Sequence, residues 1–359
     1  MSSEISAHHI SNVVALLLAM LAGIGVWSAL RHPFWGVRLR GLFQRRFAMG
    51  ALIGVLLFVA VAWLDAISWK DEVDASAAGT VSLEAQLPRS LLDRLFARVV
   101  GMPEYEYREK SYAAPLAKTE FIDKSITLKH RHLLGTTQTG YDTLYRVLKG
   151  CKPAVVIGVL PLLVAVPLAL LFGISAGFFG GRVDDGVVYV YSTLASVPDL
   201  LLLIALITAL GQGLPQVAVG LGVTGWIGLC RLVRGETLKL RELEFIQAAV
   251  CLGVPRWKII LRHIIPNLGH IVMITAILAF TGLVLTESIL SYLGIGLKHS
   301  WGAMIDNARG GLAREPAIWW NIVFASTALF TLVLVVNVVG DALRDILDPR
   351  TAVEEMKED

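Results

Sequence analysis

The feature that most constrains this chain is a series of long apolar segments. A helix needs about 20 apolar residues to cross the hydrocarbon core of a bilayer. Seven segments approach that length, at residues 12–30, 47–67, 154–180, 187–210, 216–233, 269–293 and 319–340. Only 17% of the residues are charged, whereas a soluble domain of 359 residues needs more charge to cover its surface. The sequence therefore predicts an all-α polytopic membrane protein.

The first apolar segment has two interpretations, a retained helix or a cleaved signal peptide. Residues 1–11 contain no Lys or Arg, and Arg31, His32 and Pro33 follow the segment where a small-residue cleavage site would stand. Both observations favour a retained helix.

The short loops predict an orientation, because Lys and Arg concentrate on the cytoplasmic side. Residues 31–46 hold five arginines and no acid, and residues 234–268 hold six basic residues against three glutamates. Both loops are therefore expected in the cytoplasm, with the N-terminus outside and the C-terminal tail inside. The net charge of +3 follows from this topology and gives no reason to expect nucleic acid as a partner. The three cysteines have neither disulfide nor metal spacing, and we expect no metal site.

Four regions follow from this topology. Residues 1–67 form two helices with a basic loop, residues 68–152 an extracytoplasmic cap and linker, residues 153–340 a core of five helices, and residues 341–359 a cytoplasmic tail. The cap holds one short amphipathic stretch around Leu91–Val99 and is too small and polar to predict an independent core.

The cytoplasmic loop 234–268 is longer than a simple connection requires. Phe245, Ala248, Ala249 and Leu252 fall on one face of a helix, which Gly253 is expected to end in the left-handed conformation. Pro255 suits the first turn of a second amphipathic helix, which Pro266 and Asn267 are expected to close. Two amphipathic helices meeting at a glycine corner can lie on the membrane surface or insert into a groove of a partner protein, and periodicity leaves both open.

These residues resemble a known family. Glu244, Ala248, Ala249 and Gly253, followed by Ile259, His263, Pro266 and Asn267, are similar to the EAA loop of ABC importer permeases, and more narrowly to the C-type subunit of oligopeptide and dipeptide permeases. Four further collinear blocks carry the same resemblance, at residues 134–148, 180–198, 287–302 and 340–350.

The resemblance implies a type I ABC importer fold, with an extra N-terminal helix and a cap, in a bacterial inner membrane. It implies a second permease subunit, two cytoplasmic ATPase subunits and an external substrate-binding protein as partners, with the loop coupling to an ATPase through Glu244, Ala248, Ala249, Gly253, Pro255, Ile259, His263 and Pro266. The chain has no G-x4-G-K-[ST] phosphate loop, so we expect no catalytic residue and no bound cofactor in it, with ATP and Mg²⁺ held by the partners.

Candidates for the translocation path are fewer. Glu287 lies in an apolar helix, where an ionisable group faces a cavity or a polar partner, and these two roles stay open. Pro198 and Asp199 are further candidates, and prolines at 161, 167 and 198 are expected to kink their helices.

The chain departs from the family pattern at four positions. Thr137 and Tyr141 replace an acid and an arginine, and Tyr189 and Ser192 replace an arginine and an acid. The paired losses suggest that sets of polar contacts were replaced as units, and they leave the substrate open. The alternatives to an importer are an ion-coupled secondary carrier, against which the lack of an internal repeat argues, and a membrane enzyme, for which no converging catalytic set is found.

Overall fold

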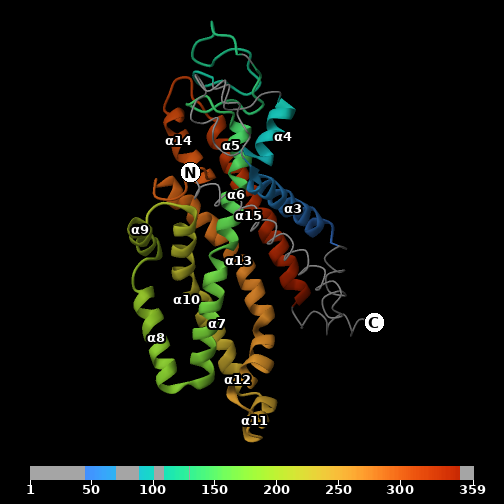
Figure 1. The fold of residues 1–359 in the computed structure, drawn as a ribbon, viewed down its shortest axis with the longest axis vertical. Coiled ribbons are helices and arrows are strands. Elements are labelled where there is room, and N and C mark those ends of the chain that lie inside the picture. The colour runs from blue at the N-terminus through green and yellow to red at the C-terminus, as the bar shows by residue number, and fades with distance from the viewer. Residues whose placement is uncertain (1–44, 70–88, 101–108, 129, 348–359) are drawn as a thin grey trace. The chain divides into compact units, whose positions relative to one another are not determined.

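The computed structural model describes residues 45–69, 89–100, 109–128 and 130–347 (Figure 1). These residues divide into two compact units, one made of the described residues up to Val155 with Lys298–Val338, and one made of Val156–Leu297 with the residues after Val338. The first unit contains α3 (Arg46–Ala66), β1 (Ser68–Trp69), β2 (Arg89–Ser90), α4 (Leu91–Val100), α5 (Thr143–Lys149), α14 (Trp301–Leu312) and most of α15 (Trp320–Leu347). The second contains the end of α6 (Cys151–Val159), then α7 (Leu162–Phe179), α8 (Gly181–Ala195), α9 (Asp199–Leu210), α10 (Leu214–Arg241), α11 (Glu244–Cys251), α12 (Arg256–Ile259), the π-helical turn η3 (Ile260–Ile264) and α13 (Ile265–Tyr292).

Five helical runs of the described residues are long and apolar enough to cross a membrane. They are α3, the run from α5 to α7, α10, the run from α12 to α13, and α15, and they confirm the spans predicted at 47–67, 154–180, 216–233, 269–293 and 319–340. The span predicted at 12–30 lies outside the described residues. The fold is therefore the predicted all-α membrane fold.

The span predicted at 187–210 is broken at Pro198, the residue at which the sequence predicts a kink. The chain forms two helices there, α8 and α9, whose axes differ by 85°. The break falls at residues 196–198, where Pro198 cannot continue the hydrogen-bond ladder of the preceding helix. The pair counts as a sixth span only if both halves are taken together.

The second unit is organised around close packing of α7 against α10, which lie side by side in Figure 1. Ala165, Ala169, Gly173 and Gly177 recur every fourth residue of α7 and are buried. A Cβ at Gly173 would stand 2.9 Å from the carbonyl oxygen of Cys230 on α10. Small residues at this spacing let two helix backbones approach, which holds helices together in lipid through dispersion contacts. We infer that α7 and α10 form a rigid pair.

The first unit gathers the cap residues around aromatic side chains. Tyr112 and Trp320 are buried together with Ile318, and the rings of Phe121 and Trp320 meet edge to face at 4.9 Å. The cap segment thus shares its core with the start of α15, in agreement with the prediction that it is too small for a core of its own.

A half-buried lysine fastens three elements of this unit to one another. Lys149 Nζ at the end of α5 lies 2.5 Å from Asp65 Oδ1 on α3 and 2.6 Å from Asp93 Oδ1 on α4. Ser90 and Asp93 also cap α4 reciprocally, since each backbone N–H donates to the other's side chain. The amphipathic stretch at 91–99 is therefore a helix with a defined start.

Candidate functional site

The residues between α10 and α13 form a compact corner, hereafter the coupling segment (242–264). α10 continues to Arg241, two turns past the end predicted at 233. α11 ends at Cys251, and Gly253 two residues later has a φ of +75°, which places it in the left-handed region. Gly253 N–H donates to the carbonyl of Val250, and Val254 N–H to that of Ala249. These two bonds make a Schellman motif, so the predicted glycine corner is confirmed.

Pro266 does not close the segment as predicted. The helical path continues from Arg256 to Tyr292 through η3, where Ile265 N–H bonds to the carbonyl of Ile260, five residues back. Pro266 sits in the first turn of α13 and has no N–H to donate. Asn267 Nδ2 donates instead to the carbonyl of His263 at 2.6 Å. A π-helical turn and a side-chain donor thus accommodate the proline.

Three isoleucines attach the coupling segment to the second unit. Ile246 on α11, Ile259 on α12 and Ile264 in η3 are fully buried and belong to the core cluster that α7 and α10 build. Ile246 lies beside the face predicted to be apolar from Phe245, Ala248, Ala249 and Leu252. The segment therefore buries a different stripe of α11 from the one that periodicity selects.

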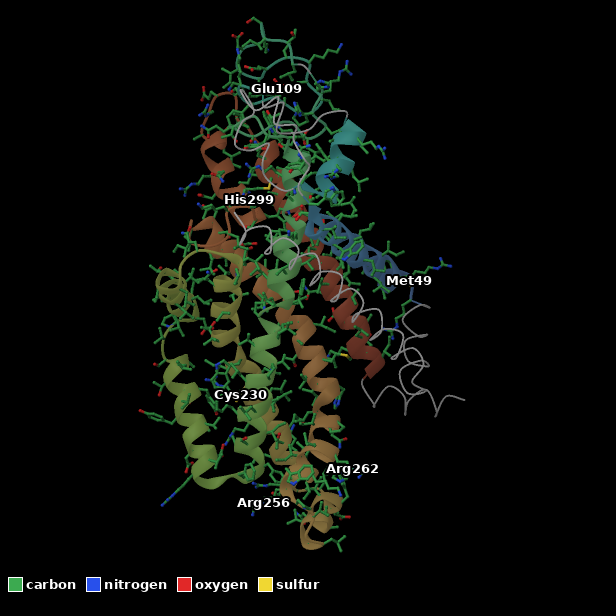
Figure 2. All side chains as sticks on the ribbon, in the orientation of Figure 1. Met49, Glu109, Cys230, Arg256, Arg262 and His299 are labelled. Carbon is green, nitrogen blue, oxygen red and sulfur yellow. The ribbon has the colours of Figure 1, made fainter. Side chains whose placement is uncertain are left out.

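Large apolar side chains remain exposed on the outer surface of the same segment. Leu252 is 83% exposed and Trp257 65% exposed. Leu243, Phe245, Val250 and Leu261 are also exposed. Charged residues are interleaved with them, and Figure 2 shows Arg256 and Arg262 close to this corner. Exposed apolar patches of this kind mark sites of interaction with another protein or with a membrane.

The remaining residues predicted for coupling lie in different environments. Glu244 opens α11 and is exposed, as are Ala248 and Pro255, whereas Ala249 is half-buried. His263 is half-buried, and its ring meets that of Phe245 edge to face at 6.1 Å. Ile259 is an anchor in the core, and Pro266 is exposed at the start of α13.

Two arginines of α10 join the base of the coupling segment to α7 and α8. Arg234 binds Asp184 with two parallel hydrogen bonds of 2.5 and 2.6 Å. Arg241 donates to the carbonyl of Gly177 at 3.2 Å. Such a fork between guanidinium and carboxylate fixes orientation as well as distance. These contacts therefore fasten the last turns of α10 to α7 and α8.

The candidates for the translocation path differ in burial, since Glu287 is buried whereas Pro198 and Asp199 are exposed. Glu287 on α13 is buried and accepts a short hydrogen bond from the hydroxyl of Ser291, whose oxygen also accepts the N–H of Leu297 at 2.7 Å. Of the two roles predicted for Glu287, this hydrogen bond fits the one in which the carboxyl group faces a polar partner. Pro198 and Asp199 are exposed at the break between α8 and α9.

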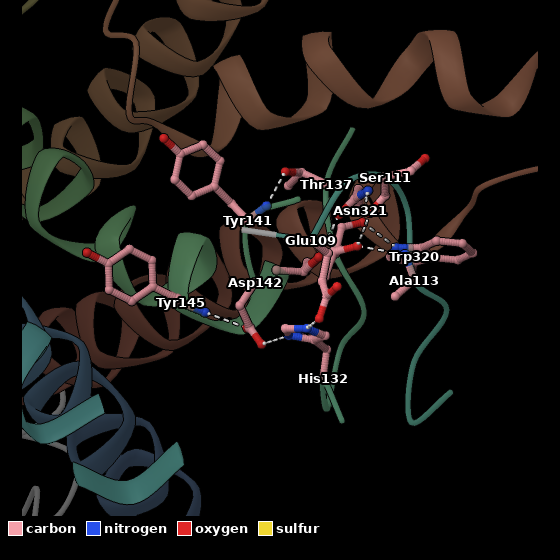
Figure 3. A network of polar contacts seen from close by, with 12 residues as sticks. Glu109, Ser111, Ala113, His132, Thr137, Tyr141, Asp142, Tyr145, Trp320 and Asn321 are labelled. Atoms are coloured by element: carbon pink, nitrogen blue, oxygen red, sulfur yellow. Dashed lines mark hydrogen bonds and ion pairs between the residues drawn. The ribbon is translucent and has the colours of Figure 1, made fainter. Parts of the chain in front are cut away.

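The first unit holds a polar network centred on Thr136. Figure 3 shows the two residues of α15 in this network, Trp320 and Asn321. The carbonyl of Thr136 accepts hydrogen bonds from Trp320 Nε1 at 2.9 Å and Asn321 Nδ2 at 3.1 Å. Asn321 Oδ1 in turn accepts from the Thr143 hydroxyl at 2.6 Å. Loop 130–142 is thereby tied to the start of both α5 and α15.

The network gives one pair of departures from the family pattern a physical meaning. Thr137 and Tyr141 contact each other, because Thr137 N–H donates to the carbonyl of Tyr141 and Tyr141 N–H to the Thr137 hydroxyl. The guanidinium of Arg146 also lies 4.4 Å from the centre of the Tyr141 ring. Tyr189 and Ser192 are both exposed on α8.

Sequence reasoning missed the isoleucine anchors, the Arg234–Asp184 pair and the network of Thr136. Asp184 and Thr136 lie in two of the blocks that carry the family resemblance, and that resemblance was the signal that could have marked these two residues as important. Their partners lie 50 and about 185 residues away along the chain, where periodicity carries no information.

Comparison with known proteins places the chain among transport proteins. Residues 169–353 match the family described as binding-protein-dependent transport system inner membrane component. The oligopeptide transport system permease protein OppC of Haemophilus influenzae is 36% identical over 62% of this chain and 72% of its own length. The dipeptide transport system permease protein DppC of Bacillus subtilis is 33% identical over 61% of this chain and 69% of its own. The glutathione transport system permease protein GsiD of Pectobacterium atrosepticum is 32% identical over 61% of this chain and 73% of its own length.

Proposed function

The chain belongs to the family of binding-protein-dependent transport system inner membrane components, and we propose on that premise that it moves peptides through the membrane and is driven by ATPase subunits docked on its coupling segment. It is a non-catalytic permease subunit with the type I ABC importer fold. Membership of this family excludes the ion-coupled carrier and the membrane enzyme weighed above.

The exposed apolar surface of the coupling segment carries the docking proposal. Leu252 and Trp257 stand beside the glycine corner, among charged residues that keep this surface out of the hydrocarbon core. A groove in an ATPase subunit would cover them by the helix-in-groove mode. Ala248 and Ala249 allow close approach on the same helix, and exposed Glu244 is available to a basic residue of that partner.

The anchors of the segment suggest how motion reaches the membrane helices. The buried isoleucines join α11 and α12 to the core of the second unit, and Arg241 and Arg234 join the end of α10 to α7 and α8. Because α7 and α10 pack backbone to backbone, a push on the coupling segment would tilt them together. ATP and Mg²⁺ would act on the partner subunits, and this chain would convert their closure into movement of its helices.

The surroundings of the chain follow from the same premise. The charge of the loops supports a cytoplasmic coupling segment and C-terminus, with the cap outside, where an external binding protein would deliver substrate. A second permease subunit, different from this one, would complete the path. The names of the relatives point to peptides as substrate, and Glu287, Pro198 and Asp199 remain proposals for the path.

A single substitution tests the docking proposal. Trp257→Glu should abolish copurification of the ATPase subunits from membranes, because a charge at a surface that becomes buried is left without a partner. Val99→Glu is the matched control, since Val99 is 84% exposed on α4 of the cap. Retention of the ATPase by Trp257→Glu, or its equal loss in the control, would refute docking. Mass spectrometry of the ligand carried by the cognate binding protein tests the peptide assignment separately.

A further inference from the structure

The cap contains a buried histidine placed between two carboxylates (Figure 3). His132 is 8% exposed. Its Nδ1 lies 2.8 Å from Asp142 Oδ2, and its Nε2 lies 3.5 Å from Glu109 Oε1. One imidazole thus faces an acid on each side.

The two carboxylates belong to different segments of the first unit. Asp142 is the N-cap of α5, where its other oxygen accepts the N–H of Tyr145 at 3.1 Å. Glu109 lies on the segment before Tyr112, and its backbone N–H donates to the carbonyl of Gly140 at 3.3 Å. Gly140 has a φ of +77°, and a Cβ there would lie 1.8 Å from the carbonyl oxygen of Glu109. His132 therefore joins the Glu109 segment to the start of the helix that leads into the membrane.

Protonation decides how many of these contacts form. An imidazolium donates from both nitrogens, whereas a neutral imidazole donates from one and presents a lone pair at the other. The neutral ring keeps its shorter bond to Asp142 and then faces Glu109 with an acceptor. Loss of one proton thus weakens the contact to Glu109 selectively.

The surrounding charges favour the protonated form. Burial by itself lowers the pKa of His132, but the hydrogen bond to Asp142 and the negative charges of Asp142 and Glu109 outweigh it, so the pKa is raised above its ordinary value of 6.5. The nearby Lys110, His130 and Arg131 are exposed on the same two segments. The side chains that reach the network from α15, Trp320 and Asn321, are uncharged.

We propose that His132 is a proton-controlled latch, which holds the Glu109 segment to loop 130–142 when protonated and releases it as the external pH rises. The external location of the latch rests on the orientation in the proposed function. The latch acts on transport because the loop that it holds also ties α5 to α15 through Thr136. Transport is therefore expected to decline as the medium becomes alkaline.

Hydrogen–deuterium exchange of the assembled importer in sealed vesicles tests the latch. Protection of the segment that begins at Glu109, corrected for the intrinsic pH dependence of exchange, is followed from about pH 5 to about pH 9. We expect a step of about tenfold toward faster exchange, centred above the ordinary histidine pKa. His132→Gln should remove the step, and His130→Gln, two residues away on the same loop, should leave it in place.

A second variant keeps the test decisive if His132→Gln does not fold. Glu109→Gln removes one of the two negative charges, so the midpoint of the step should move to lower pH. Wild-type protection that does not change with pH, a step that survives His132→Gln, or an unmoved midpoint in Glu109→Gln would overturn the latch. A step that follows the pH of the cytoplasmic compartment would support the latch and contradict the proposed orientation.

Discussion

Leu252→Ala gives the sharpest quantitative test of the docking surface. Leu252 follows α11 and is 83% exposed, and its backbone N–H bonds to the carbonyl of Ala248 regardless of the side chain. Burial of a leucine side chain contributes roughly 1.5–3 kcal/mol. Truncation to alanine removes most of that gain, so we expect a loss of about 1.5 kcal/mol, or about tenfold in Kd for the ATPase.

The assay titrates purified ATPase subunits onto the permease pair in lipid nanodiscs, and thermal unfolding of each variant is measured in parallel. Leu252→Ala should raise Kd and leave the unfolding temperature unchanged, because the side chain has few contacts within the chain. Ile246→Ala is the internal contrast. This side chain is 1% exposed, so its loss leaves a cavity and should lower stability by about 2–5 kcal/mol.

Two results would refute the reasoning. An unchanged Kd for Leu252→Ala would mean that the exposed apolar side chains are not buried by the ATPase. A fall in unfolding temperature equal to that of Ile246→Ala would mean that Leu252 contributes to the fold and not to the docking surface.

Three further outcomes concern the cap. Gly140→Ala should lower the unfolding temperature by the equivalent of at least about 2 kcal/mol. The new Cβ would overlap the carbonyl of Glu109, and alanine rarely adopts the left-handed φ of this position. An unchanged unfolding temperature would contradict this backbone conformation. Thr143→Val should cost about 1–3 kcal/mol in the same measurement, since Asn321 loses a buried partner, and a neutral effect would count against that bond. The raised pKa of His132 adds stability that is fully present below the unfolded value of 6.5 and is lost as pH rises through the folded value. Unfolding followed against pH should therefore show a decline in stability as pH rises past 6.5, and this decline should be absent in His132→Gln.

Local chemistry explains which parts of the fold the sequence could predict. Membrane spans follow from apolar length, and the corner at Gly253 follows from the conformational freedom of glycine beside Pro255. Both properties belong to residues adjacent in the chain. The sequence prediction ends α10 at residue 233, two turns too early, because the last two turns carry charged residues. Hydropathy identifies only the apolar part of a helix and gives no signal for such a charged extension.

The orientation of the coupling segment depended on contacts that no local pattern encodes. Spacing alone favours the stripe with Phe245 and Leu252 as the buried face, yet Ile246 is buried because it packs into the same core cluster as Ile259 and Ile264. His132 likewise acquires its significance only from the acids that the fold brings to both of its nitrogens. Such pairs could not be predicted from periodicity, because tertiary packing decides them.

The central claim, that ATPase subunits cover the coupling segment, can be tested directly at Cys251. This cysteine is exposed at the end of α11, next to Leu252, whereas Cys151 and Cys230 are buried. Maleimide labelling of the permease pair is compared with and without bound ATPase subunits. The account predicts rapid labelling of Cys251 in the free pair and strong protection in the complex, whereas equal labelling in both would contradict it.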